Sequence, residues 1–262
     1  MRHRMLALLL LFAAHLHIGT PRAKAQDLTF EQATQRLRSR DHDEILLAIQ
    51  SLGLLGNARA VEPITERIRE GLAPDLLESA IDTLTVLGRA EAGPILFELT
   101  SHRRPEVRVR AIAAIAATRP RGADRALVSA LSDSSPEVRG AAAMAIGELN
   151  IVSAVDSLFL AFDRGVPEAG PALGRIARPE HVPRILQSLG RVPFAQMRAV
   201  IESLLDQRNL PARSRLDVIA RLGELATGEV RLFLEEWIRN SSMPESDPIR
   251  RAAEAVIARI QS

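Results

Sequence analysis

Proline and apolar residues recur along the chain with a fixed period. The repeated proline stands at intervals of 31 residues, at Pro74, Pro105, Pro136 and Pro167. A proline in the first turn of a helix loses no hydrogen bond, and the acidic residue that follows each one suits the positive end of the helix dipole. The apolar spacing therefore predicts one helix near the start of each period, over residues 44–55, 75–87, 106–118 and 137–149.

A second apolar segment with helical spacing follows within each period. Its first example is Val61, Ile64 and Ile68, and matching pairs recur at Ile95 and Leu99, Leu127 and Leu131, and Val155 and Leu158. Two antiparallel helices thus repeat about every 31 residues. Such pairs bury their apolar faces by stacking on their neighbours. The predicted fold class is all-α: an α-solenoid (superhelix) of antiparallel helix pairs.

The first helices of two periods are rich in alanine, at positions 111–116 and 141–145. The distance between packed helices depends on the side chains at the contact. We therefore expect the first helices of neighbouring periods to approach one another closely.

The chain opens with a segment that is typical of exported proteins. Residues 1–25 combine a basic start, a short apolar run and an Ala-Lys-Ala sequence, the pattern of a secretory signal peptide. We expect this segment to be removed before Gln26, without membrane insertion of the mature chain, and the protein to be periplasmic or secreted. A retained N-terminal anchor is the alternative.

The rest of the chain divides by how regular the repeat is. Residues 26–41 are predicted to form an N-terminal capping helix, in which Thr29 and Gln32 have the spacing of a capping box. Regular repeats follow over residues 42–166. Residues 167–206 form a degenerate region, because glycine and proline interrupt its first helix, and residues 207–262 hold a C-terminal repeat and a capping helix.

The pairing of helices in the last third is less clear from the sequence. Residues 193–206 predict a helix whose pairing stays open. Residues 211–226 look like the first helix of a pair, because their ending Leu222-Gly223-Glu224-Leu225 is close to Ile146-Gly147-Glu148-Leu149.

The repeats carry a family resemblance. Residues 105–117 with 122–131, and 136–149 with 153–162, resemble HEAT-like repeats of the phycobilisome-lyase type. The resemblance implies a right-handed solenoid whose second helices line the concave side, and usually a protein partner. Some members bind a bilin and help to attach it. A related enzyme, deoxyhypusine hydroxylase, holds two irons on His-Glu pairs, and this chain has no His-Glu dipeptide.

Charge argues against nucleic acid as a partner. The full chain has a net charge of +2, but without the basic residues of the predicted signal peptide the acidic residues outnumber the basic ones by two. The net charge thus gives no general attraction to phosphate. Aromatic residues, which could stack on bases, make up only 3% of the chain. We expect a protein partner, no nucleic acid, and a monomer or weak oligomer.

No set of residues has the spacing of a catalytic or metal site, so we predict no cofactor. His42 lies in the cluster 41–44, whose acids are typical of a helix start, with a metal site as the alternative. Ser129, Ser153 and Ser157 are expected to cap helices, and Gly53 and Gly56 to end the first repeat helix. Arg108 and Arg139 offer either an arginine row for a partner or a structural ladder to acids such as Asp133, which we favour. Trp237 is expected in the core.

The candidate partner-binding surface is the face of the second helices that points away from the core. It consists of Glu62, Glu66, Glu70, Phe97, Arg125, Ser129, Asp156 and Leu160. The predicted function is a non-enzymatic protein-interaction scaffold that binds its partner on this face. The alternative is a bilin-lyase-like or metal-dependent, oxidoreductase-type enzyme or cofactor carrier.

Overall fold

The computed structural model describes residues 28–261 of the chain. Every regular element in this part is an α-helix or a short 3-10 helix, and residues 28–261 contain no β-strand, which confirms the all-α prediction. The predicted signal peptide, residues 1–25, lies outside the described residues. The chain divides into two units after Arg89, and each is considered by itself.

The first unit begins with the predicted capping helix. Its helices are α3 (Phe30–Arg36), α4 (His42–Leu55), α5 (Val61–Glu70) and α6 (Pro74–Leu87), with the 3-10 helix η1 (Ala58–Ala60) before α5. The Thr29 hydroxyl accepts a hydrogen bond from the backbone N–H of Gln32, and the Gln32 side chain accepts one from the N–H of Thr29. The capping box is therefore confirmed, and α3 packs on α4.

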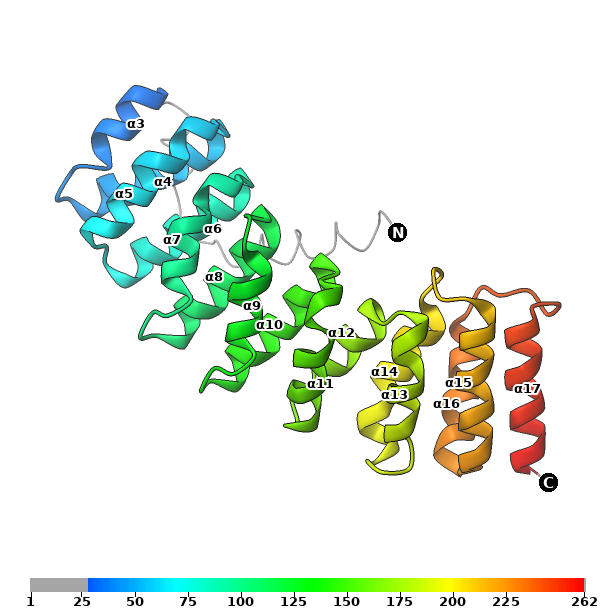
Figure 1. The fold of residues 1–262 in the computed structure, drawn as a ribbon. Coiled ribbons are helices and arrows are strands. Elements are labelled where there is room, and N and C mark those ends of the chain that lie inside the picture. Colours follow the sequence, from blue (N-terminus) through cyan, green and yellow to red (C-terminus); the bar gives the residue numbers. More distant parts are fainter. Residues whose placement is uncertain (1–27, 262) are drawn as a thin grey trace. The chain divides into compact units, whose positions relative to one another are not determined.

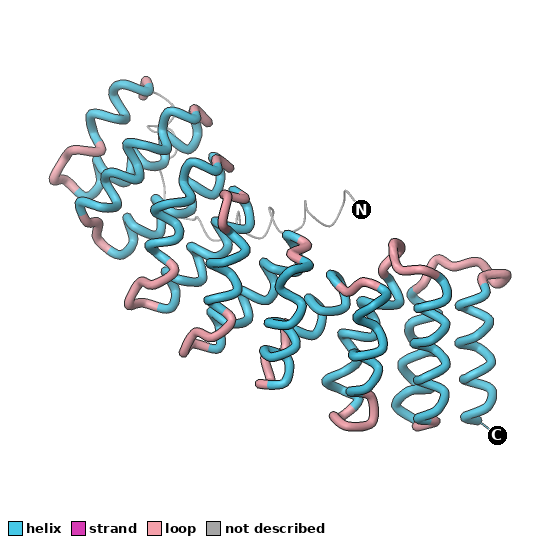
Figure 2. Tube along the Cα trace, in the orientation of Figure 1, coloured by secondary structure: helices cyan, strands magenta, loops and turns pink. Residues whose placement is uncertain are grey.

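The second unit is a longer stack of helices (Figure 1). Its first helices are α7 (Gly93–Leu99), α8 (Pro105–Thr118), α9 (Ala123–Ala130), α10 (Pro136–Leu149), α11 (Val155–Asp163) and α12 (Ala169–Ile176). The stack continues with α13 (Val182–Ser188), α14 (Phe194–Asp206), α15 (Ala212–Leu225), α16 (Gly228–Asn240) and α17 (Pro248–Gln261). The 3-10 helices η2 (Ala90–Ala92), η3 (Val152–Ala154) and η4 (Pro179–His181) precede α7, α11 and α13. Figure 2 shows that its loops gather at the helix ends, which leaves the sides of the helices to form the faces.

Helix boundaries follow the predicted signals with two differences. Pro74, Pro105 and Pro136 are each the first residue of a helix, as expected. In the degenerate period, α12 begins two residues after Pro167 and is short, with 8 residues. Gly56 ends α4 with a left-handed backbone (φ 62°), as predicted, but Gly53 lies inside the helix. A Cβ on Gly53 would lie 3.2 Å from Thr83 Cγ2, so this glycine serves the contact between α4 and α6 instead of ending the helix.

Small residues bring successive first helices of the second unit into close contact. A Cβ on Gly147 of α10 would lie 3.1 Å from the Cα of Ala172 in α12. The alanines at 111, 114, 142 and 143 are fully buried. The predicted role of alanine is therefore confirmed, and glycine extends it at the tightest contacts.

The tightest approach between successive first helices joins α12 to α14. A Cβ on Gly174 would lie 2.4 Å from Ser203 Cβ and 2.6 Å from the carbonyl oxygen of Val200. A Cβ on Gly170 would lie 3.0 Å from Val200 Cγ2. The glycines that weaken the repeat pattern in this region thus allow α14 to lie against α12, as the next first helix.

The structure settles the pairing that the sequence left open. α16 lies beside α14, because the rings of Phe194 and Phe233 are 5.6 Å apart and Trp237 Nε1 donates to Asp206 Oδ1 at 3.0 Å. α15 lies between α13 and α17. We therefore define the A row of the second unit as α8, α10, α12, α14 and α16, and its B row as α7, α9, α11, α13, α15 and α17.

The prediction that residues 211–226 form the first helix of a pair is wrong, because α15 belongs to the B row. Arg221 Nη2 donates to the carbonyl oxygen of Leu189 beside α13, and Arg259 Nη2 of α17 donates to that of Gly223. The resemblance between the endings of α15 and α10 has a physical cause. Gly147 and Gly223 both leave room for a neighbouring helix. A close neighbour can require glycine in a helix of either row. The domain boundaries at residues 41, 166 and 206 stay predictions.

A glycine-to-alanine change tests the contact between α12 and α14. Gly174→Ala should lower the free energy of unfolding by roughly 1 to 3 kcal/mol, because the added methyl group meets backbone atoms of α14. The matched control is Gly228→Ala in the first turn of α16, where no atom lies within 4 Å of an added Cβ. It should change stability by about 0.5 kcal/mol or less. Denaturant unfolding compares the two, and equal effects would contradict the close approach.

Candidate partner-binding surface

The repeated arginines bind acidic and carbonyl groups of the protein itself. Their positive charges are therefore not available to a partner. Arg108 in the first turns of α8 forms a two-pronged ion pair with Asp133, with Nε to Oδ2 at 2.9 Å and Nη2 to Oδ1 at 2.7 Å. The two side chains are 11% and 14% exposed. Arg108 Nη1 also donates to the carbonyl oxygens of His102 and Arg103. The predicted structural ladder is confirmed at this position.

Two further arginines close loops in the same way. Arg139 Nη1 donates to the carbonyl oxygens of Asp133 and Ser134, in the loop before α10. Arg250 Nη1 donates to the carbonyl oxygen of Met243, in the loop before α17. Each guanidinium ties a helix start to the loop that leads into it, so these arginines do not form a row offered to a partner.

The Asp133 carboxylate links two successive loops. Burial raises the pKa of Asp133, but hydrogen bonds from Arg108 and from the backbone N–H of Ser135 outweigh it, so this pKa lies below its ordinary value. The carboxylate thus stays ionised and bound well below neutral pH.

The candidate residues in the first unit are solvent-exposed, as the proposed surface requires. Glu62, Glu66 and Glu70 lie on α5, whose opposite side is buried. Glu70 is 3.6 Å from Arg67, whose Nε and Nη1 donate to the carbonyl oxygens of Leu37 and Gly71. The exposed side of α5 therefore carries acidic groups.

In the second unit, α11 and α13 meet in a charged and apolar cluster. Arg184 Nη1 of α13 is 2.5 Å from Asp156 Oδ1 of α11. The guanidinium carbon of Arg184 also lies 3.8 Å from the ring centroid of Phe159. Leu160, the next residue of α11, is 55% exposed. Asp156, Phe159, Leu160 and Arg184 are called the α11–α13 cluster below.

The remaining candidates lie on α7 and α9. Phe97 is half-buried, because its ring lies over the backbone of Gly122, where Cε2 and Cζ are 3.9 Å from an added Cβ. Arg125 and Ser129 are exposed. Ser129 lies in the last turn of α9, so the expectation that it caps a helix start is wrong. Instead it lines a polar pocket of about 340 Å³ with Thr100 and other hydroxyl-bearing residues.

Sequence reasoning missed Arg184. The α11–α13 cluster includes this residue because α13 follows α11 more closely than the repeat predicts, after a 3-10 turn at Pro179–His181. A search at the fixed period therefore passes over it. The available signal in the sequence was an arginine, Arg184, on the second helix that follows the one with the exposed Asp156.

The other residues considered for chemistry have structural contacts. His42 Nε2 is 2.8 Å from Asp75 Oδ2, and Asp41 caps α4 by accepting from the N–H of Glu44. His102 Nδ1 and His181 Nδ1 accept backbone hydrogen bonds. Trp237 is buried, as predicted. Among residues 28–261, no group of three or more acidic or histidine side chains could hold a metal ion. In the same range, no helix has the length and apolar character needed to cross a membrane.

Comparison with known families agrees with this architecture. Residues 93–168, which run from α7 to the start of α12, match the HEAT repeats family. This part of the chain therefore consists of HEAT repeats. No curated protein sequence matches it.

Three solved structures align with this chain at low sequence identity. A chain of the complex of CpcE and CpcF of phycocyanin lyase from Nostoc aligns with a TM-score of 0.50 and 16% identity, over 94% of this chain and 98% of that chain. An engineered protein aligns at 0.46 and 16%, over 89% and 68%. A designed armadillo repeat protein solved with a peptide aligns at 0.42 and 17%, over 88% and 100%. At 16% identity, the likeness to the phycocyanin lyase chain shows the fold alone.

The Arg108–Asp133 pair yields a stability prediction. Asp133→Asn should lower the free energy of unfolding by roughly 2 kcal/mol at neutral pH, because it removes the charged acceptor of a buried pair. Because the pKa of Asp133 is lowered in the folded state, this difference should be full above the ordinary carboxyl pKa. It should disappear as the pH falls through the folded-state pKa.

Urea unfolding of both proteins between neutral and acidic pH measures this difference. Asp163→Asn, at the exposed end of α11, is the control and should leave stability nearly unchanged. A gap between Asp133→Asn and the wild type that stays constant down to strongly acidic pH would contradict the assignment.

Proposed function

We propose that the protein is a non-enzymatic scaffold that binds a protein partner on the B-row side of its HEAT repeats. The α11–α13 cluster carries this proposal. It presents a large exposed apolar side chain, Leu160, beside an ion pair and an arginine held against an aromatic ring. Apolar and arginine side chains of this kind supply the anchors of protein interfaces.

The geometry around Leu160 supports a preformed contact. The Phe159 ring holds the Arg184 guanidinium against α11, and the exposed ion pair with Asp156 adds little to this contact. Less side-chain freedom of Arg184 is therefore lost when a partner covers it. Arg125 and Ser129 add polar groups on α9, which packs against α10 as α11 does. In the first unit, the acidic groups of α5 are further candidate contacts.

A binding role also fits the contacts of the titratable residues. The histidines and the repeated arginines are engaged with caps, loops and ion pairs, which supports binding in preference to catalysis. The alternative, a bilin-lyase-like or metal-dependent enzyme or cofactor carrier, has the fold likeness to a phycocyanin lyase chain in its favour. A chromophore or metal that copurifies with the protein would favour this alternative.

A pair of matched substitutions tests the proposed surface. Leu160 in the B row and Met144 in the A row are 55% and 52% exposed, so Leu160→Asp and Met144→Asp should be equally well folded. We expect Leu160→Asp to weaken the partner complex by tenfold or more, as at an interface anchor. Met144→Asp should leave the affinity unchanged.

The measurement has two stages. Affinity capture from the native envelope fraction first identifies a partner that the wild type and Met144→Asp both retain. Titration of the purified partner with each variant then gives the dissociation constants. Equal weakening by both substitutions, or by neither, would place the interface away from the α11–α13 cluster.

We also propose that the protein is exported to the periplasm or the cell exterior, on the basis of residues 1–25. The intact mass of the protein from its native cells should correspond to a chain that begins at Gln26, found in the envelope or secreted fraction. A full-length chain in that fraction would indicate a retained anchor, and a cytosolic protein would rule out export.

A further inference from the structure

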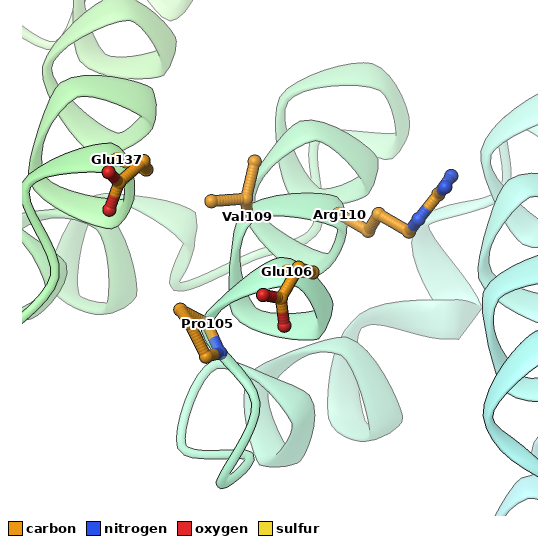
Figure 3. Close-up of a pocket in the computed structure, with 5 residues that line it drawn as sticks. All are labelled: Pro105, Glu106, Val109, Arg110 and Glu137. Carbon is orange, nitrogen blue, oxygen red and sulfur yellow. The ribbon is translucent and has the colours of Figure 1, made fainter.

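A pocket lies on the A-row side, between the starts of α8 and α10 (Figure 3). Pro105, Glu106, Val109, Arg110 and Glu137 line it, and its volume is about 390 Å³. Figure 3 shows the Val109 side chain on α8 pointing toward α10, with Glu106 also on α8 and Glu137 on α10. The Arg110 side chain extends away from Val109. Besides Arg110, the lining thus consists of two apolar side chains, Pro105 and Val109, and two carboxylates, Glu106 and Glu137.

Comparison with the next period explains why this space is open. The residues one period after Val109 and Glu137 are Gly140 and Glu168. There the Glu168 carboxylate lies against the bare helix, with Oε2 2.7 Å from the position of a Cβ on Gly140. Glu168 is accordingly half-buried, whereas Glu137 is exposed. We attribute the pocket to the Val109 side chain, which occupies the space that the glutamate takes in the next period.

The charges at the rim are well defined. The Ser135 hydroxyl donates to Glu137 and lowers the pKa of this carboxyl, so Glu137 is ionised at neutral pH. Glu106 has a long contact of 3.7 Å with Arg104, and both groups are open to solvent. Such exposed pairs are weak, so Glu106 can turn to a competing cation.

From this arrangement we propose that the pocket binds a lysine or arginine side chain of a protein partner. The aliphatic stem lies on Pro105 and Val109, and the cationic head lies between the carboxylates of Glu106 and Glu137. A long side chain with an apolar stem and a charged end matches this combination. The volume falls within the range of sites that hold small ligand groups.

This site is independent of the proposed B-row interface. It lies on the other row of helices and shares no residue with the α11–α13 cluster. It adds a second contact region for which the partner chemistry is specified. Because it is small and open, we expect millimolar affinity for an isolated side chain.

The test uses two amino-acid derivatives that differ in charge. N-acetyl-lysine methylamide is titrated into the full chain, followed by the NMR shifts of the Val109 methyl groups and of the backbone amides at the starts of α8 and α10. We expect saturable shifts that weaken as salt is raised, because the contact is solvent-exposed. N-acetyl-norleucine methylamide has the same stem without the ammonium group and should bind several-fold more weakly.

Substitutions assign the effect to the two carboxylates. Glu106→Gln and Glu137→Gln should each lower the lysine affinity roughly two- to fivefold, the range of exposed ion pairs. Glu148→Gln, near the other end of α10, is the control and should leave it unchanged. Val109→Gly should reduce binding further, since Glu137 could then close over the helix as Glu168 does.

Three results would overturn the proposal. Equal affinity for norleucine and lysine would mean that the pocket is an apolar depression without charge selection. Absence of saturable shifts would mean that it holds no such side chain. Unchanged affinity in Glu106→Gln and Glu137→Gln would place the cation elsewhere. None of these outcomes would affect the B-row proposal, which is tested at Leu160.

Discussion

The second unit depends on close contact between the backbones of successive A-row helices. Side chains at these contacts must be small, and the structure meets this need with alanine in α8 and α10 and with glycine at Gly147, Gly170 and Gly174. Helices packed this closely exchange many weak dispersion contacts. The chain has no cysteine, so the stack has no disulfides and is held by packing and by hydrogen bonds at the loops.

The loop arginines complement this packing. A helix start leaves backbone N–H groups without partners, and a loop leaves carbonyl groups without partners. Arg108 and Arg139 satisfy loop carbonyls from inside the helix that follows, and Asp133 links the two positions. The degenerate period has Gly170 at the matching place, which serves the contact with α14 instead. The period therefore loses its loop arginine where it gains a tight helix contact.

The sequence predicted the bounds of the helices better than the contacts between them. Proline starts and apolar spacing act within one helix, so α8, α10, α14 and α15 were placed to within about two residues. Pairing of α15 was predicted wrongly, because a glycine near a helix end reports a close neighbour without saying which row provides it. Arg184 was missed for a related reason, since a shortened period moves a residue out of the register on which the search relied.

The regularity of the stack also singles out residues that contact between neighbouring helices does not explain. At most positions a repeat residue is explained by contact with its neighbours, as Gly147 is by Ala172. Val109 and Leu160 are different: the first opens a space that Gly140 allows a glutamate to fill, and the second is exposed next to the Arg184–Phe159 contact. Stacking of the helices requires neither feature. In a repeat protein, such departures from the repeat are the positions where a partner's chemistry is best sought.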